Sequence, residues 1–146
     1  MTRKSKVIAT LGNSTDSILE KIVDGGADAV LIDTYYGEEE ENVSRIEKIK
    51  QLREKLNKNT AIIYDLDHIY AQSKYKLIKI EEESVDFACK HDVDFIACPF
   101  VSNIDEIRKV KDILTSRGKK DIGLIVKIDC KEAYDNIDEI ISFADS

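Results

Sequence analysis

The sequence predicts an α/β fold made of five βα units whose strands run parallel. Short runs rich in β-branched residues alternate with segments in which apolar residues recur every three or four positions. Glycines and short polar stretches separate the two kinds of segment. Because a helix-length segment lies between successive strands, the connections are crossovers, and crossovers of this length join parallel strands.

The first unit opens with a strand over Lys6–Leu11, which passes through Gly12 into a helix that Ser14 or Thr15 can cap. The apolar positions of this helix fall on one face, and a glycine pair ends it: Ile18, Leu19, Ile22 and Val23, followed by Gly25 and Gly26.

The second strand, Ala29–Ile32, is a continuous apolar run, as expected for a strand covered on both faces, and it stops at Asp33. The acidic run Glu38–Glu41 then begins a second helix, where carboxylates oppose the positive end of the helix dipole. We favour this solvated helix start over a metal site. The helix carries an apolar stripe of Val43, Ile46, Ile49 and Leu56.

The third strand, Ala61–Tyr64, ends at the polar stretch Asp65–His68. The lysine-rich segment Ile69–Ile80 alternates only loosely, which indicates a loop or a small hairpin. A helix follows over Glu81–His91, with its inward positions at Val85, Ala88 and Cys89.

The fourth strand, Asp94–Cys98, is closed by Pro99, and Ser102 or Asn103 caps the most regular helix of the chain. Its apolar positions are Ile104, Ile107, Val110, Ile113 and Leu114, and Gly118 follows as a stop. A fifth strand covers Gly123–Ile128, and a last helix carries Ala133, Ile137, Ile140 and Ile141.

The composition predicts one domain over residues 1–146 in a reducing compartment, the cytoplasm. The 146 residues are 42% hydrophobic, enough for a real core, and no apolar run reaches the roughly 20 residues of a membrane span. A net charge of −7 disfavours nucleic acid and anionic membranes as partners. Cys89, Cys98 and Cys130 lack paired C-x-x-C spacing, so we expect buried thiols rather than a zinc site.

Candidate site residues stand where the predicted strands end. Asp33, Asp65 and Asp129 each lie at the carboxyl end of a strand, with Lys127 beside the last of them. In a barrel these ends converge on one rim, and carboxylate oxygens there suit Mg²⁺ or a monovalent cation. The competing interpretation is that the aspartates cap the following helices and that Lys127 pairs with one of them. The pair Asp67–His68 could add ligands.

Two architectures fit this pattern: part of a (β/α) barrel, or an open, doubly wound flavodoxin-like sheet. Periodicity does not separate them, and no strand-to-helix turn carries a glycine-rich nucleotide motif.

Several segments, taken together, resemble the catalytic barrel domain of pyruvate kinase. The similar segments are Ser5–Gly12, Gly25–Gly37, Tyr64–Asp65, His91–Val101, and Val126–Asp129 followed by Asn136–Ile140. The resemblance runs in register over nearly the whole chain and favours the barrel, here half of a TIM-like one. It implies that the chain stops where the family's sixth strand would begin. It also implies that 69–80 replaces the family's lid domain, and that the rest of the barrel and the C-terminal domain are absent.

The resemblance also implies an activity: phosphoryl transfer from phosphoenolpyruvate to ADP, dependent on Mg²⁺ and K⁺. Position by position, however, most of the family's functional residues are changed. The family's arginine becomes Leu31, its potassium ligands become Asp33 and Tyr35, its nucleotide-contacting histidine becomes Tyr36, and a later arginine becomes Gln72. Asp65 and the catalytic Lys127 are retained, while the metal-binding glutamate is shortened to Asp129 and its partner carboxylate would lie beyond the C-terminus.

We therefore expect a degenerate protein, inactive alone, that serves as a binding, regulatory or assembly subunit. The open flanks of the first and fifth strands would be covered by self-association into a homodimer, or by docking on a full-length pyruvate kinase or another subunit. One alternative is a pyruvate kinase that is active only with a partner chain. Another is a module that binds phosphate or a small molecule at the rim.

Overall fold

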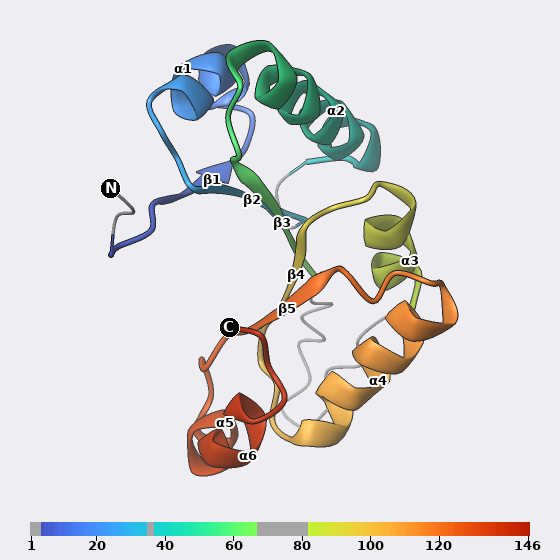
Figure 1. The fold of residues 1–146 in the computed structure, drawn as a ribbon. Coiled ribbons are helices and arrows are strands. Elements are labelled where there is room, and N and C mark those ends of the chain that lie inside the picture. The colour runs from blue at the N-terminus through green and yellow to red at the C-terminus, as the bar shows by residue number, and fades with distance from the viewer. Residues whose placement is uncertain (1–3, 35–36, 67–81) are drawn as a thin grey trace. The chain divides into compact units, whose positions relative to one another are not determined.

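The computed structural model describes residues 4–34, 37–66 and 82–146. The strands and helices follow one another in the order that the sequence predicts (Figure 1). They are β1 (Ile8–Leu11), a 3-10 turn (Asp16–Ile18), α1 (Leu19–Asp24), β2 (Ala29–Asp33), α2 (Glu39–Leu56), β3 (Ala61–Asp65), α3 (Glu82–Lys90), β4 (Phe95–Cys98), α4 (Ile104–Ser116), β5 (Gly123–Val126), α5 (Lys131–Asp135) and α6 (Ile137–Ile141). The loop or hairpin predicted over 69–80 lies outside the described residues.

The five strands form one sheet in the order β1-β2-β3-β4-β5, in which β1 runs parallel to β2 and β4 runs parallel to β5. This confirms the predicted α/β fold of five parallel βα units. A flavodoxin-like sheet places its first strand between the second and third, whereas a barrel adds each strand beside the one before it. The sequential order therefore favours the partial barrel over the doubly wound alternative.

The chain divides into two compact units, residues 1–64 and 65–146. In the first unit, β1 pairs with β2 so that Ile8 stands opposite Ala29, and α1 lies beside α2 over these strands (Figure 1). Val30 and Ile32 of β2 are fully buried, while the alternate residues Leu31 and Asp33 are half-buried. This alternation follows from the period of two along a strand.

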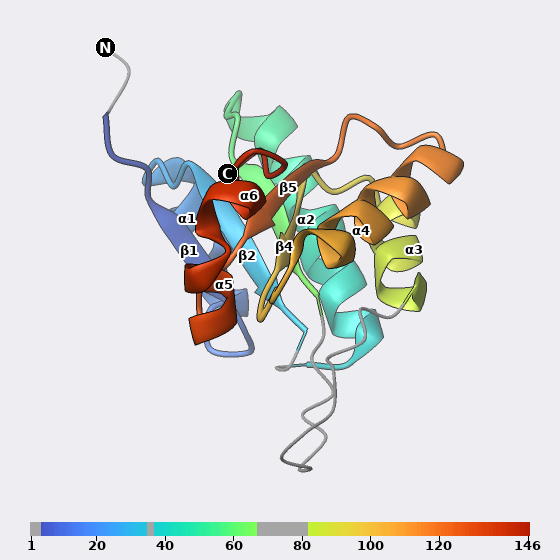
Figure 2. The ribbon, with the colours of Figure 1, turned by 90° about the horizontal axis from the view of Figure 1, so that it is seen from below.

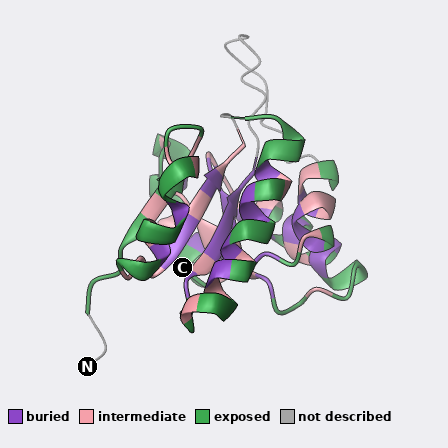
Figure 3. Cartoon of the chain, turned by 90° about the horizontal axis from the view of Figure 1, so that it is seen from above, coloured by how far each residue is buried: buried purple, intermediate pink, exposed green. Residues whose placement is uncertain are grey.

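In the second unit, β4 pairs with β5 so that Ile96 stands opposite Leu124, and both side chains are fully buried. Helix α4 packs against α3 and also contacts α6 (Figure 2). The predicted stripe of α4 is buried, and Asn103 caps the helix by accepting a hydrogen bond from the Asp105 N–H at 3.0 Å. Figure 3 shows buried residues along the strands and on the helix faces toward them.

Three local expectations need correction. The last helix is two short helices, α5 and α6, separated at Asn136. The first helix begins with a 3-10 turn, and the Thr15 hydroxyl bonds both the N–H and the carbonyl of Gly12 instead of capping a helix. The outer edge of β5 is not open, because Asp145 and Ser146 hydrogen-bond along it.

The acidic run Glu38–Glu41 is a helix start, as predicted. Helix α2 begins at Glu39, and Glu38 and Glu41 form a reciprocal capping box in which the Glu41 carboxylate accepts from the Glu38 N–H at 3.2 Å.

Candidate functional site

Two of the four predicted site residues meet in the second unit, where β3 and β5 end. The Lys127 ammonium donates to the Asp65 carboxylate, with a distance of 2.7 Å between Nζ and Oδ2. The Lys127 N–H also bonds the Cys98 carbonyl at 3.0 Å, which fixes the lysine beside the end of β4. The Asp65 side chain is only 9% exposed and that of Lys127 is 39% exposed, so the pair is half-sheltered from water.

Asp129 holds a loop in place rather than capping a helix. Its Oδ1 accepts the Phe100 N–H at 2.8 Å, and Phe100 has a positive φ of 50°, unusual for an aromatic residue. The N-cap of α5 is the neighbouring residue Cys130, whose sulfur accepts from the Ala133 N–H at 3.4 Å. The expected pairing of Lys127 with an aspartate is therefore present, and the expected capping by Asp129 is wrong.

Asp33 is the last residue of β2 and lies in the first unit, half-buried. It does not cap the next helix either, because the N-cap of α2 is Glu38. Tyr35, Tyr36, Gln72 and the pair Asp67–His68 lie outside the described residues.

The described part of the chain holds no cluster of side chains large enough to form a metal site by itself. Within residues 4–34, 37–66 and 82–146, no group of three or more histidine, cysteine, aspartate or glutamate side chains could hold a metal ion. In the second unit, Asp65 bonds an ammonium and Asp129 bonds a backbone N–H. Each of these two carboxylates is thus engaged by a donor of the protein itself. The cation site at Asp33, Asp65 and Asp129 stays a prediction.

Sequence reasoning missed a buried arginine that organises the loop between β1 and α1. The Arg45 side chain is 3% exposed and reaches from α2 to Asp16, with Nε to Oδ1 at 2.7 Å and Nη2 to Oδ2 at 2.8 Å. It also donates to Asn13 at 2.6 Å and to Asn42 at 3.0 Å. The helical periodicity could have indicated that Arg45 is buried, because this residue falls on the same face of α2 as Ile46 and Ile49.

The ion pair between Arg45 and Asp16 shifts the pKa of each group so that its charged form is favoured. The hydrogen bond from Arg45 lowers the pKa of Asp16, and the bond to Asp16 raises the pKa of Arg45. The pair therefore stays ionised over the whole neutral range.

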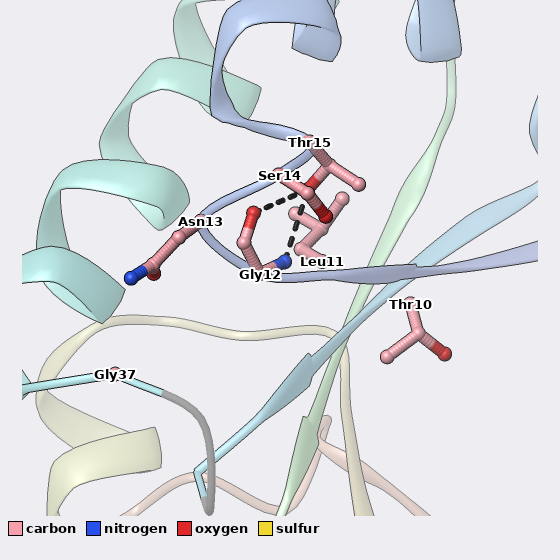
Figure 4. Close-up of a pocket in the computed structure, with 7 residues that line it drawn as sticks. All are labelled: Thr10, Leu11, Gly12, Asn13, Ser14, Thr15 and Gly37. Carbon is pink, nitrogen blue, oxygen red and sulfur yellow. Dashed lines mark hydrogen bonds between the residues drawn. The ribbon is translucent and has the colours of Figure 1, made fainter.

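The loop pinned by Arg45 lines a hollow of about 530 Å³ (Figure 4). Its lining is uncharged and consists of Thr10–Thr15 and Gly37. Gly37 has a φ of +120°, and a Cβ built there would lie 2.7 Å from Nη1 of Arg45 and 2.8 Å from Oε2 of Glu41. Only glycine fits this position without displacing the buried guanidinium.

These features define a class of protein: a parallel βα domain of barrel topology, with a lysine–aspartate pair at its strand ends. The sequence model of the pyruvate kinase barrel domain matches residues 73–146, which is half of the chain. The chain therefore belongs to the pyruvate kinase family, as its resemblance predicts.

The longer matches to individual relatives reach beyond that half of the chain. The chain is similar to the pyruvate kinase of Clostridium perfringens, with 44% identity over 59 residues, which are 40% of this chain and 12% of that protein. It is 38% identical over 86 residues to the enzyme of Thermotoga maritima (58% of this chain, 18% of that one). It is 32% identical over 103 residues to that of Dictyostelium discoideum (70% and 19%). The matched segments thus span less than a fifth of these relatives' own length.

None of the described helices combines the length and the apolar character that crossing a membrane requires.

Proposed function

We propose that this chain is a degenerate pyruvate kinase barrel segment that does not turn over substrate by itself and acts through association. Its partner would be a second copy, a full-length pyruvate kinase or another subunit, in the cytoplasm. The observation that supports this is the state of the retained lysine: the Lys127 ammonium already bonds Asp65 at 2.7 Å. An anionic substrate would have to compete with that carboxylate for the cation.

The second support is the residue at the middle of β2. By resemblance, the family has an arginine where this chain has Leu31, a half-buried aliphatic side chain that cannot balance a phosphoryl charge. Phosphoryl transfer relies on positioning and charge neutralisation. Loss of one preorganised group of this kind costs roughly 100- to 1,000-fold in rate, so turnover by the chain alone should fall close to background.

A second candidate function is phosphoryl transfer from phosphoenolpyruvate to ADP by a complex in which a partner chain completes the site. It is favoured by the hydrogen bond between Lys127, which follows β5, and Asp65, which ends β3, with Asp129 two residues beyond Lys127. Leu31 counts against it, because a partner cannot replace a side chain inside this chain.

A coupled assay of pyruvate formation separates the two candidates. We would measure the chain alone and mixed with the full-length enzyme of the same organism, with phosphoenolpyruvate, ADP, Mg²⁺ and K⁺ present. The test variant is Lys127→Ala. The matched control is Lys131→Ala, which removes an exposed lysine that pairs with Asp135 on the same short helix.

We expect no turnover above background from the chain alone, and co-elution of the chain with itself or with the full-length enzyme. Pyruvate formation by the purified chain that Lys127→Ala abolishes and Lys131→Ala leaves intact would refute the proposal. A mixture that forms pyruvate faster than the full-length enzyme alone, with the excess rate lost in Lys127→Ala and kept in Lys131→Ala, would favour the second candidate.

A further inference from the structure

The outer edge of β5 is already used by the chain itself. The N–H groups of Asp145 and Ser146 donate to the Leu124 carbonyl at 3.0 and 3.2 Å, and the Val126 N–H donates to the Ser146 carbonyl at 2.9 Å. The Asp145 carboxylate accepts the Leu124 N–H at 2.9 Å. Figures 1 and 2 both show the C-terminal residues beside β5. Ser146 thus makes the bond pattern of a parallel neighbour.

Two cations of α4 hold this C-terminal segment in place. Lys111 donates to the Phe143 carbonyl at 2.6 Å, and its ammonium lies 5.4 Å from the centre of the Phe143 ring. The Arg108 guanidinium lies 5.3 Å from the same ring. The segment is therefore anchored, and a partner that used this edge would have to displace it.

The outer edge of β1 is different. The Val7 carbonyl accepts hydrogen bonds from Asp28 and Ala29, so Val7 turns its backbone toward β2. Because backbone groups alternate along a strand, Ile8 and Thr10 direct their N–H and C=O groups to the other side. Since β1 is the first strand of the sheet, no described strand lies there.

This edge is protected only by the shortness of β1, which has four residues, and by Lys6, which precedes the strand and lies 3.5 Å from Asp28. Natural edge strands carry charged side chains, proline or bulges that prevent pairing with another chain. Here the stretch from Val7 to Thr15 has no charged residue and no proline. The Ile8 side chain is 52% exposed, and Val7 beside it is also exposed.

We propose that the edge of β1 is a self-association surface that pairs antiparallel with β1 of a second copy, about a two-fold axis at Ala9. This proposal rests on the assembly role proposed above and identifies the surface through which the chains associate. In this register Ile8 of one copy faces Thr10 of the other, so the outward N–H and C=O groups of both residues are satisfied. Lys6 faces Gly12, so no like charges are opposed.

A second copy is favoured as the occupant because each chain offers one such edge among its described residues. When only one edge is available, edge-to-edge association must use the same surface on both chains. An interface of that kind closes as a two-fold dimer and does not continue into a filament.

The test measures the mass of the purified chain by light scattering over a range of concentrations. We expect a concentration-dependent mass of twice 16.6 kDa for the unaltered chain. Ile8→Lys should weaken the dimer at least tenfold by placing a charge on the edge. Ile141→Lys is the matched control, because it makes the same change at an exposed isoleucine of the second unit. Circular dichroism checks that both variants fold.

A second variant tests the register. In the proposed register, Ala9 of one copy faces Ala9 of the other, and the two residues are not hydrogen-bonded to each other. Residues opposed in this way lie close enough for a disulfide. Ala9→Cys should therefore form a covalent dimer under mild oxidation. The unaltered chain, which keeps Cys130, serves as the control.

The outcomes separate this inference from the proposed function. A dimer that survives Ile8→Lys, or an Ala9→Cys chain that dimerises without cross-linking, overturns the β1 pairing and leaves an assembly role standing. A chain that is monomeric at every concentration but co-elutes with the full-length enzyme also overturns the pairing while supporting the assembly role. A monomer that binds nothing and is active in the coupled assay refutes both.

Discussion

The buried Arg45 gives the sharpest stability prediction. Asp16→Asn should destabilise the chain because it removes the charge that compensates a guanidinium only 3% exposed. The change keeps the size of the side chain and one of its two acceptor oxygens. It leaves Asn13 and Asn42 as partners of Arg45, with the Glu41 carboxylate 3.8 Å away.

The magnitude follows from the bonds that are lost. A hydrogen bond to a charged group contributes about 1.5–3 kcal/mol when it is buried. The Asp16 side chain is 44% exposed, so its attraction to Arg45 is screened and the lower end of that range applies. We expect a loss of about 2 kcal/mol in the free energy of unfolding, which corresponds to a fall of roughly 5–8 °C in Tm for a chain of this size.

Urea unfolding followed by circular dichroism measures this loss. The matched control is Asp24→Asn, because Asp24 is an exposed aspartate 3.6 Å from Lys58, and we expect a change within about 0.5 kcal/mol there. Equal, small losses in the two variants would refute the conclusion that burial of Arg45 makes Asp16 important.

The same pair predicts a pH dependence. Because Arg45 lowers the pKa of Asp16 in the folded chain, the contribution of Asp16 is complete above its unfolded pKa of about 3.9. It is lost as the pH falls through the folded pKa. The stability difference between the unaltered chain and Asp16→Asn should therefore be constant from neutral pH to about pH 5 and then shrink. A difference that grows on acidification would contradict this.

Three further predictions concern packing, backbone and thiols. Ile107→Ala, at a fully buried position, should cost about 2–5 kcal/mol in urea unfolding, and Ile141→Ala, at an exposed one, under about 0.5 kcal/mol. Gly37→Ala should cost at least about 1 kcal/mol because of its positive φ and the clash described above. Gly12→Ala, where an added Cβ meets no atom within 4 Å, should be near neutral in the same urea unfolding experiment. Burial raises the pKa of the Cys98 thiol to about 12. A thiol reagent at pH 8 should therefore label Cys98 only after unfolding, and rapid labelling of the native chain would contradict this.

The order of strands and helices could be predicted from the sequence because each signal is local. The apolar run Ala29–Ile32 and the stripe of α4 follow periods of two and 3.6 residues, and both lie buried where those periods place them. The family could also be predicted, because segments such as His91–Val101 keep their register along the chain. The split of the last helix at Asn136 was not predictable, because no glycine or proline marks it.

The sequence alone therefore specifies the set of βα units and the residues that end each strand. Which side chains meet depends on the tertiary packing. Lys127 bonds Asp65, which is 62 residues away in the chain, while Asp129 holds the Phe100 loop. Arg45 is buried against Asp16 and Asn13, and the last two residues occupy the edge of β5. The physical reason is that periodicity reports which face of an element is buried, whereas ion pairs and edge hydrogen bonds depend on how distant segments pack against one another.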